Sequence, residues 1–412
     1  MDVPPITNPA WRDIVSGKVK YQFDFLATKM ILGWLTAQVK NNPSPRTIQK
    51  CAEELHNVFA RNADLPVVQH DLRQIFKKDV SSECMNEIAE VKEKIARGQK
   101  LLLAGDEGLL RQVPAGAWIG GTIPYFVTEQ GGLSTRDKIY VTELPDLISD
   151  LSIKVYDKTT ISSLYTDMTR NGFSIIIMPA SCATHFEFAL NAPKYKDFAT
   201  RPLMGWISGV HLNDLGKLTP KVFCGSTKTG LEDGAVVMHI ALPETHAAEV
   251  GILNIFEQGD GDTLTFPQDG FSARMVYVNE VETNFAQYVA EKRLDTRLPL
   301  VADYYGTAVN VSFQGVDEAK QEVKFYAPVF KGVPYKHAKP IEDYVGQFTL
   351  RLQTKLARPT TFSCNCILNY LYSELEGKQT GGITGPATFG EVAYQLLNQT
   401  MVYLTINDLT TQ

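Results

Sequence analysis

The stretch that says most about the fold is residues 362–377, FSCNCILNYLYSELEG, because it changes character in its middle. FSCNC reads as extended, and ILNYLYSELEG has the apolar spacing of a helix, so a strand is predicted to run directly into a helix. Cys364 and Cys366 would then point to the same side of the strand. With Asn365 they would meet the first amides of the helix, an electropositive end that can hold an anion or a polar ligand. The alternative is that both cysteines are small apolar residues in a core.

Metal and redox chemistry fit this stretch poorly. A tetrahedral zinc site needs two more nitrogen or sulfur ligands, and the chain has no second CxC or CxxC and no HExxH among its seven histidines. A redox pair more usually has the CxxC spacing at a helix start. We therefore expect no metal site.

The composition is that of an ordinary soluble globular protein. The chain has 412 residues, of which 44% are hydrophobic and 21% charged, enough for a large core and two or three domains. No apolar run reaches the length of a membrane span, and MDVPPITNPAW lacks the pattern of a signal peptide. Six cysteines are too sparse for a disulfide framework. We expect a cytoplasmic protein with mostly free thiols.

Charge is unevenly distributed along the chain. Residues 1–78 carry 11 Lys or Arg and 7 Asp or Glu, a net charge of +4, which leaves −10 for the remainder of the total of −6. No stripe of basic and aromatic residues is present, so nucleic acid is not an expected partner.

The apolar pattern divides the chain near residue 80. Residues 1–78 show amphipathic helical repeats and predict a small all-α docking or oligomerisation unit, followed by a linker at 79–84. Two larger segments, 85–245 and 246–412, interleave strand-like runs such as SIIIMP, AVVMHIALP, QFTLRLQ and MVYLTIN with helical ones such as THFEFALNAPKY and AEVGILNIFEQG. Several strands follow one another directly, so an α+β or α/β fold with mixed sheets flanked by helices is expected.

Two loops look like ligand motifs but lack the required residues. GSTKTG at 225–230 is followed by Leu231 and Glu232 where a phosphate-binding loop needs Lys and Ser or Thr. GDGD at 259–262 lacks the further oxygen ligands of a calcium loop. Both are interpreted as turns.

Cys182 and His185 form a further candidate site. SCATHF follows the buried-looking strand SIIIMP where the chain turns into a helix, and strand ends of this kind line ligand crevices. Cys182 is a conceivable nucleophile with His185 as its base, although there is no GxSxG elbow.

The last fifty residues resemble the C-terminal half of FIST domains, which are bacterial sensory modules. The shared pattern is a cysteine-bearing strand entering a helix, a Gly-Glu turn, and an Asn/Thr element before a final strand; here these features fall on Cys364, on Gly390 with Glu391, and on Asn398 with Thr400. Upstream, Cys224 to Thr227 look like the G-C-S-T segment of the N-terminal half in altered order. The segment LLLAGDEGLLRQVPAGAWIGGTIPYF also looks typical of an uncharacterised bacterial family.

This resemblance implies a FIST-like fold over residues 85–410 and a sensory role. FIST domains are thought to bind small ligands, amino acids being one proposal, and some relatives are associated with haem, for which His185 would be the axial candidate. No cofactor is otherwise expected. The leading hypothesis is a non-catalytic module that binds a small molecule and signals through its helical unit, a separate protein or self-assembly. Its expected ligand-binding residues are Cys364, Asn365, Cys366, Glu391, Asn398, Thr400, Cys182 and His185.

Two other function classes stay open. Residues 1–78 carry large apolar side chains in short helices, and a unit this small could hold chains together as a homo-oligomer. A cysteine-dependent hydrolase or acyl transferase would need Cys182 or Cys364 to have a lowered pKa and a histidine within reach.

Overall fold

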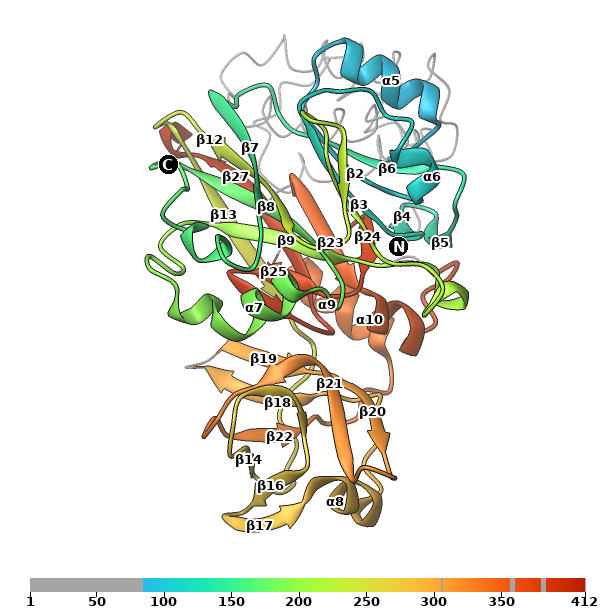
Figure 1. Cartoon of the computed structure of the whole chain (residues 1–412), viewed down its shortest axis with the longest axis vertical. Coiled ribbons are helices and arrows are strands. Elements are labelled where there is room, and N and C mark those ends of the chain that lie inside the picture. The colour runs from blue at the N-terminus through green and yellow to red at the C-terminus, as the bar shows by residue number, and fades with distance from the viewer. Residues whose placement is uncertain (1–83, 305–306, 356–359, 379–382, 412) are drawn as a thin grey trace, which may run out of the picture. The chain divides into compact units, whose positions relative to one another are not determined.

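The chain divides into two compact units, residues 1–82 and 83–412. The computed structural model describes residues 84–304, 307–355, 360–378 and 383–411 (Figure 1). The helical unit expected over 1–78 and the assembly role based on it therefore lie outside the described residues, as does nearly all of the linker. The rest is a mixed α+β fold with several mixed sheets and few helices, as the sequence predicts.

One six-stranded sheet lies near the start of the second unit. Its order is β1 (Met85–Asn86), β6 (Ile139–Glu143), β2 (Leu101–Gly105), β3 (Trp118–Thr122), β10 (Val222–Cys224) and β11 (Thr229–Leu231). Only β2 and β3 are parallel. Helix α5 (Ile88–Ala96) buries Val91 and Ile95 in a cluster with Trp118, and the four-residue α6 (Glu107–Leu110) follows β2.

Two further six-stranded sheets contain strands from both expected halves of the unit. The first has the order β26 (Gln395–Leu397), β25 (Glu391–Ala393), β9 (Leu203–Ser208), β8 (Gly172–Pro179), β12 (Ala235–Ala241) and β7 (Asp150–Tyr156). The second has the order β13 (His246–Leu253), β27 (Met401–Asp408), β23 (Phe362–Cys366), β24 (Gly385–Thr388), β4 (Tyr125–Thr128) and β5 (Gly131–Ser134). In each of these two sheets, strands from before the expected boundary at residue 245 pair with strands from after it.

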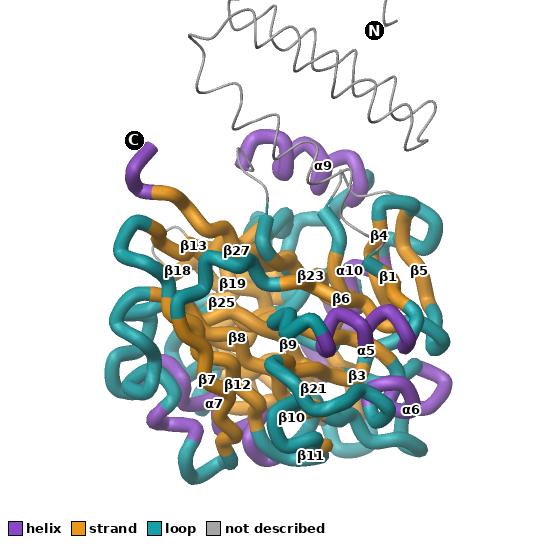
Figure 2. The backbone as a smooth tube through the Cα atoms, turned by 90° about the horizontal axis from the view of Figure 1, so that it is seen from above, coloured by secondary structure: helices purple, strands orange, loops and turns teal. Residues whose placement is uncertain are grey.

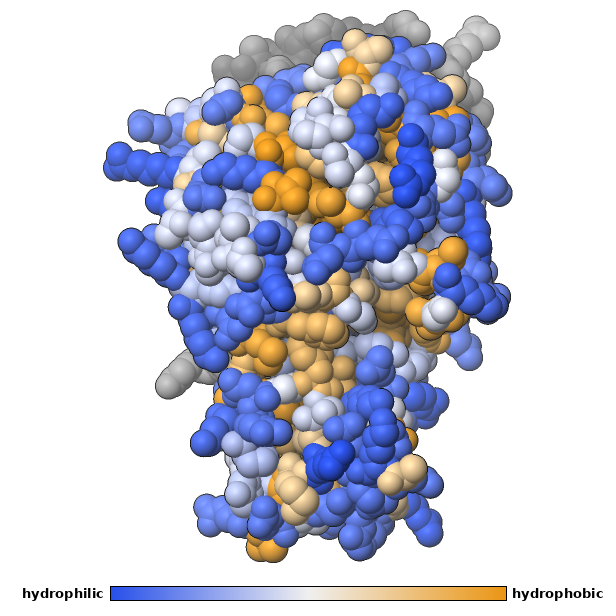
Figure 3. Space-filling model, in the orientation of Figure 1, coloured by the Kyte–Doolittle hydropathy of each residue, from blue (hydrophilic) through white to orange (hydrophobic). Residues whose placement is uncertain are grey.

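The main core lies between these two sheets. Trp206 of β9 and Phe362 of β23 place their ring centroids 5.3 Å apart, and one buried cluster joins Ile175, Ile177 and Met238 with Val402 and Leu404. Helix α7 (Ala183–Asn191) follows β8, and α9 (Tyr344–Lys355) precedes β23 in the chain (Figure 2). Tyr344 and Phe348 of α9 belong to the same core. On the face drawn in Figure 3, hydrophobic side chains reach the surface in separate groups among hydrophilic ones.

The segment between β13 and α9 forms its own smaller core. Its strands are β14 (Leu264–Thr265), β15 (Gly270–Ala273), β16 (Met275–Val278), β17 (Val281–Asn284), β18 (Leu300–Tyr304), β19 (Thr307–Val311), β20 (Phe313–Asp317), β21 (Glu322–Val329) and β22 (Tyr335–His337), all antiparallel, with helix α8 (Phe285–Lys292). Phe266, Phe285, Phe325 and Tyr335 are buried together at its centre.

Two sequence expectations about element type are wrong. QFTLRLQ, expected as a strand, lies in α9, because Asp343 accepts a hydrogen bond from the Gly346 amide and so caps a helix whose buried Tyr344 and Phe348 are four residues apart. AEVGILNIFEQG, expected as a helix, begins in β13: Ala248, Val250 and Ile252 alternate onto one face, and the strand pairs with β27 along eight residues.

Candidate functional site

The C-terminal motif residues come together where β23 runs into α10 (Ile367–Tyr372). Glu391 begins β25, and its Oε2 accepts hydrogen bonds from the backbone amide and the hydroxyl of Thr400, at 3.2 and 2.8 Å. Asn365 Oδ1 accepts from the Cys366 amide at 2.8 Å and from Asn369 Nδ2 at 2.9 Å. Asn369 Nδ2 also lies 3.4 Å from the Thr400 carbonyl, which connects the two groups. None of these five side chains is more than 5% exposed.

Glu391 is a carboxyl group without solvent access. Burial raises its pKa from 4.5 to about 8, although the hydrogen bonds from Thr400 and the nearby Cys366 thiol oppose the shift. No basic side chain of the described residues offsets the burial, so this carboxyl is mostly protonated at neutral pH. The carboxyl that the sequence predicts as a ligand contact is therefore a neutral group with no exposure to solvent.

Three buried side-chain oxygens in the cluster have no hydrogen-bond partner among the residues described: Glu391 Oε1, Asn398 Oδ1 and Asn369 Oδ1. A protonated Glu391 carboxyl can donate as well as accept, whereas the two amide oxygens can only accept. Buried amide oxygens without a partner are uncommon, and a donor that reaches one of them stabilises it.

The two cysteines of β23 belong to the core as well as to the cluster. Cys364 Sγ donates to the Gly205 carbonyl at 3.5 Å, and both Cys364 and Cys366 lie in the main apolar core. Burial and the nearby Glu391 raise the pKa of both thiols well above 9.0. The helix that follows has only six residues, and its first four residues are buried.

A second layer of amides, which sequence reasoning missed, holds the segment 398–400 in place. Asn310 Nδ2 donates to the carbonyls of Asn398 and Gln399, each at 3.2 Å, and its Oδ1 accepts from Asn254 Nδ2 at 2.8 Å. Gln399 in turn donates to the Arg297 carbonyl at 2.9 Å. The available signal was a single asparagine inside each of the apolar runs ILNIF, AVNVSF and ILNYL.

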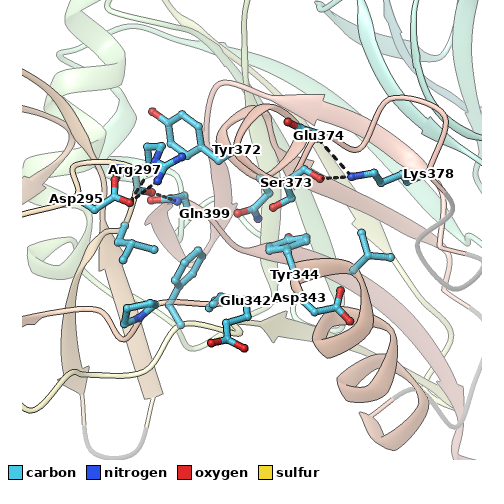
Figure 4. A pocket seen from close by; sticks show the side chains of 16 residues that line it. Asp295, Arg297, Glu342, Asp343, Tyr344, Tyr372, Ser373, Glu374, Lys378 and Gln399 are labelled. Carbon is cyan, nitrogen blue, oxygen red and sulfur yellow. Dashed lines mark hydrogen bonds and ion pairs between the residues drawn. The ribbon is translucent and has the colours of Figure 1, made fainter.

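A pocket of about 380 Å³ lies directly outside this cluster (Figure 4). Asn369 and Gln399, both 2% exposed, contribute to its wall and to the buried network at once. The Tyr344 hydroxyl also approaches the side chains of Asn365 and Asn369, which lower its pKa against the larger raising effect of burial. The remaining wall comes from the loops before β18 and α9 and from the end of α10: Phe256, Asp295, Arg297, Leu298, Pro340, Ile341, Glu342, Asp343, Val345, Tyr372, Ser373, Glu374 and Lys378.

Cys182 and His185 lie at the start of α7, and none of their hydrogen bonds reaches the C-terminal cluster. Cys182 Sγ accepts from the His185 amide at 3.3 Å, His185 Nδ1 accepts from the Ser181 amide at 3.2 Å, and Asp233 accepts from the Thr184 amide at 3.0 Å. Burial raises the pKa of Cys182 to about 11 and lowers that of His185 to about 4. The thiol caps a helix and is not hydrogen-bonded to the imidazole ring.

Within the described part of the chain, no three His, Cys, Asp or Glu side chains are grouped so that they could hold a metal ion. No helix in that part is long and apolar enough to cross a membrane.

Comparison with known proteins identifies the family of the chain. Residues 86–407 match the "Family of unknown function (DUF6976)". No curated protein and no solved structure matches the chain. Because the matched residues include every strand and helix from α5 to β26 and nearly all of β27, the chain belongs to this family of unknown function, DUF6976.

Proposed function

We propose that this protein is a non-catalytic module that binds a small molecule in the pocket between α9 and α10. The observation that carries the proposal is that Asn369 and Gln399 line the pocket and are also part of the buried network of Glu391 and Thr400. The volume of about 380 Å³ is within the range of small-ligand sites.

The connection between pocket and core suits a sensory role. A ligand that hydrogen-bonds to Asn369 changes the partners of a side chain that bridges Asn365 of β23 and the backbone before β27. Binding at the pocket is thereby coupled to the packing of two central strands. The resemblance to FIST domains agrees with this role. We propose that the signal passes to a separate protein or through a homo-oligomer, and that the protein works in the cytoplasm, where the five described cysteines remain free thiols.

The raised pKa values of Cys182 and Cys364 argue against the enzyme hypothesis, which named these two thiols as nucleophiles. A nucleophilic cysteine requires a lowered pKa and a base. Burial raises the pKa values of Cys182, Cys364 and Cys366, so these thiols remain protonated at neutral pH. The resemblance to FIST domains would make His185 the axial ligand of a haem. This residue is 5% exposed, and its ring lies against Phe186 and Phe271. We therefore propose neither a thiol enzyme nor a haem site.

The test is a thermal-shift screen of the full chain against amino acids, nucleotides, acyl compounds, amines and haem. Ser373→Trp is the blocking variant, because Ser373 lines the pocket from a half-exposed position outside the buried network. Ser162→Trp, at an exposed position outside the pocket, is the matched control. The proposal expects at least one class to raise the melting temperature of the wild type and the control but not of Ser373→Trp. A flat response to every class contradicts it.

A further inference from the structure

One residue of the inner wall of the pocket has a buried oxygen atom without a hydrogen-bond partner among the described residues. Asn369 is 2% exposed, and its amide nitrogen is already used in bonds to Asn365 Oδ1 and the Thr400 carbonyl. Its Oδ1 has no partner among the described residues. An occupant that supplies an N–H or O–H group at this wall satisfies a buried acceptor, whereas a carboxylate or phosphate placed there has no donor to offer.

The side chains around the pocket carry an excess of negative charge. Among the residues that the structure describes, four carboxylates and two cationic groups line it: Asp295, Glu342, Asp343, Glu374, Arg297 and Lys378. This lining has a net charge of −2 when all six are ionised, from four negative and two positive groups. A cleft lined mainly by one sign of charge concentrates small ions of the other sign.

Both cationic groups are already paired with carboxylates. Arg297 uses Nε and Nη2 for Asp295, the shortest contact being 2.7 Å, and Lys378 Nζ lies 3.8 Å from Glu374 (Figure 4). Glu342 forms no ion pair with any described residue, and Asp343 uses one oxygen to cap α9. The charge left over at the rim is therefore negative.

Aromatic rings complete the lining. Tyr344 and Phe256 are buried at the wall, and Tyr372 is 41% exposed. Ring faces attract organic cations and also pack against apolar groups. This lining therefore suits a cation that carries a hydrocarbon or aromatic body better than a hydrated metal ion.

We propose that the pocket binds small organic amines in their protonated form, an inference that rests on the proposed function of the same pocket. A primary ammonium group has three N–H donors and no acceptor. It satisfies Asn369 Oδ1, is attracted by the rim carboxylates, and leaves its organic body against the tyrosine rings. A quaternary ammonium lacks the donor for Asn369, and an anion meets the negative rim.

The experiment compares three probes of one shape and different charge. Binding of 4-fluorobenzylamine, 4-fluorobenzyl alcohol and 4-fluorobenzoate to the full chain is followed by fluorine NMR at neutral pH and low salt. We expect the amine to bind at least tenfold more tightly than the alcohol, and the benzoate most weakly. Ser373→Trp is expected to remove the binding of the amine.

Two charge-matched variants test the origin of that preference. Glu342→Gln is expected to weaken amine binding about threefold or more without changing alcohol binding. Glu244→Gln removes the same charge from an exposed position outside the pocket and is expected to change neither amine binding nor alcohol binding. Asn369→Leu is expected to abolish amine binding. If this buried substitution prevents folding, the comparison of Glu342→Gln with Glu244→Gln still tests whether the rim charge determines the preference for the amine.

The outcomes separate the inference from the proposed function. If the alcohol or the benzoate binds as tightly as the amine and Ser373→Trp blocks it, the pocket is a ligand site and the amine inference is overturned. If none of the three binds while another class in the thermal screen does so in a pocket-dependent way, the inference is again overturned and the function stands. If no compound of any class binds, both the amine inference and the proposed function are overturned.

Discussion

The hydroxyl of Thr400 donates a 2.8 Å hydrogen bond to Oε2 of Glu391, a carboxyl group with no exposure to solvent. The backbone amide of Thr400 supplies a second donor at 3.2 Å to the same oxygen. The other oxygen has no partner among the described residues. Two neutral donors on one side do not stabilise a buried negative charge sufficiently, so the group keeps its proton to about pH 8.

Stability is expected to fall as pH rises from about 6.5 to 8. The native state holds the Glu391 proton up to a pKa of about 8, while the unfolded chain loses it near 4.5, so the contribution is complete below 4.5 and is lost as pH rises through 8. The decline over this window is on the order of 1 to 2 kcal/mol. Urea unfolding followed by tryptophan fluorescence at the two pH values measures it.

Glu391→Gln removes the titrating group and is expected to flatten that decline. Glu244→Gln removes an exposed carboxyl outside the cluster and is expected to leave the decline as in the wild type. An equal decline in all three proteins would show that Glu391 does not carry it.

Thr400→Val is expected to destabilise the protein by about 1 to 3 kcal/mol, because Glu391 loses its shorter hydrogen bond while the shape of the side chain is kept. Thr400→Ser keeps the hydroxyl and loses only a methyl group, so a smaller cost, about 1 kcal/mol, is expected. Equilibrium urea denaturation compares the two. If Ser and Val cost the same, the hydroxyl contact is not what stabilises this position.

His239 is expected to make the stability fall as pH decreases, which is opposite to the effect of Glu391. It is 1% exposed between Ser174 and Tyr156, with both ring nitrogens hydrogen-bonded at 2.8 Å. Burial lowers its pKa from 6.5 to about 4, so its contribution to stability is present above 6.5 and is lost as pH falls through 4. His239→Gln is expected to reduce the loss of stability between about pH 6.5 and 5, measured by urea unfolding. The half-buried His246, changed to Gln, serves as the control.

The thiols are expected to react with iodoacetamide in the order of their exposure. Among the described cysteines only Cys84 is half-exposed, whereas Cys182, Cys364 and Cys366 are buried and have raised pKa values. Peptide mapping by mass spectrometry after brief native labelling should find Cys84 modified before these three. Rapid labelling of Cys182 at mildly acidic pH would reverse this order and restore the enzyme hypothesis.

The sequence predicts the elements that are buried on both sides and the residues that share a motif. SIIIMP and AVVMHIALP form β8 and β12, since continuous apolar runs of this length have few alternatives. The Gly-Glu and Asn/Thr positions of the FIST-like pattern direct attention to Glu391 and Thr400, which do lie together in the structure.

Other features depend on partners far away in the chain. QFTLRLQ satisfies a strand pattern and a helix pattern equally, and only the cap at Asp343 and the core behind Phe348 decide between them. Asn369 and Gln399 belong to no recognisable sequence motif, and their importance comes from a pocket wall built largely by loops that are distant in the sequence, such as the one that contains Arg297. Local patterns contain no information about such walls.

The order of strands in the sheet of β4 and β5 also limits when the protein can fold. Three of its four interior strands, β27, β23 and β24, come from residues after 361, and β13 pairs along its full length with β27. During synthesis β4, β5 and β13 leave the ribosome long before these partners exist. The growing chain therefore exposes unpaired sheet edges until residues 362–408 have been made, and a chain that stops before residue 401 lacks the strand that joins β13 to β23.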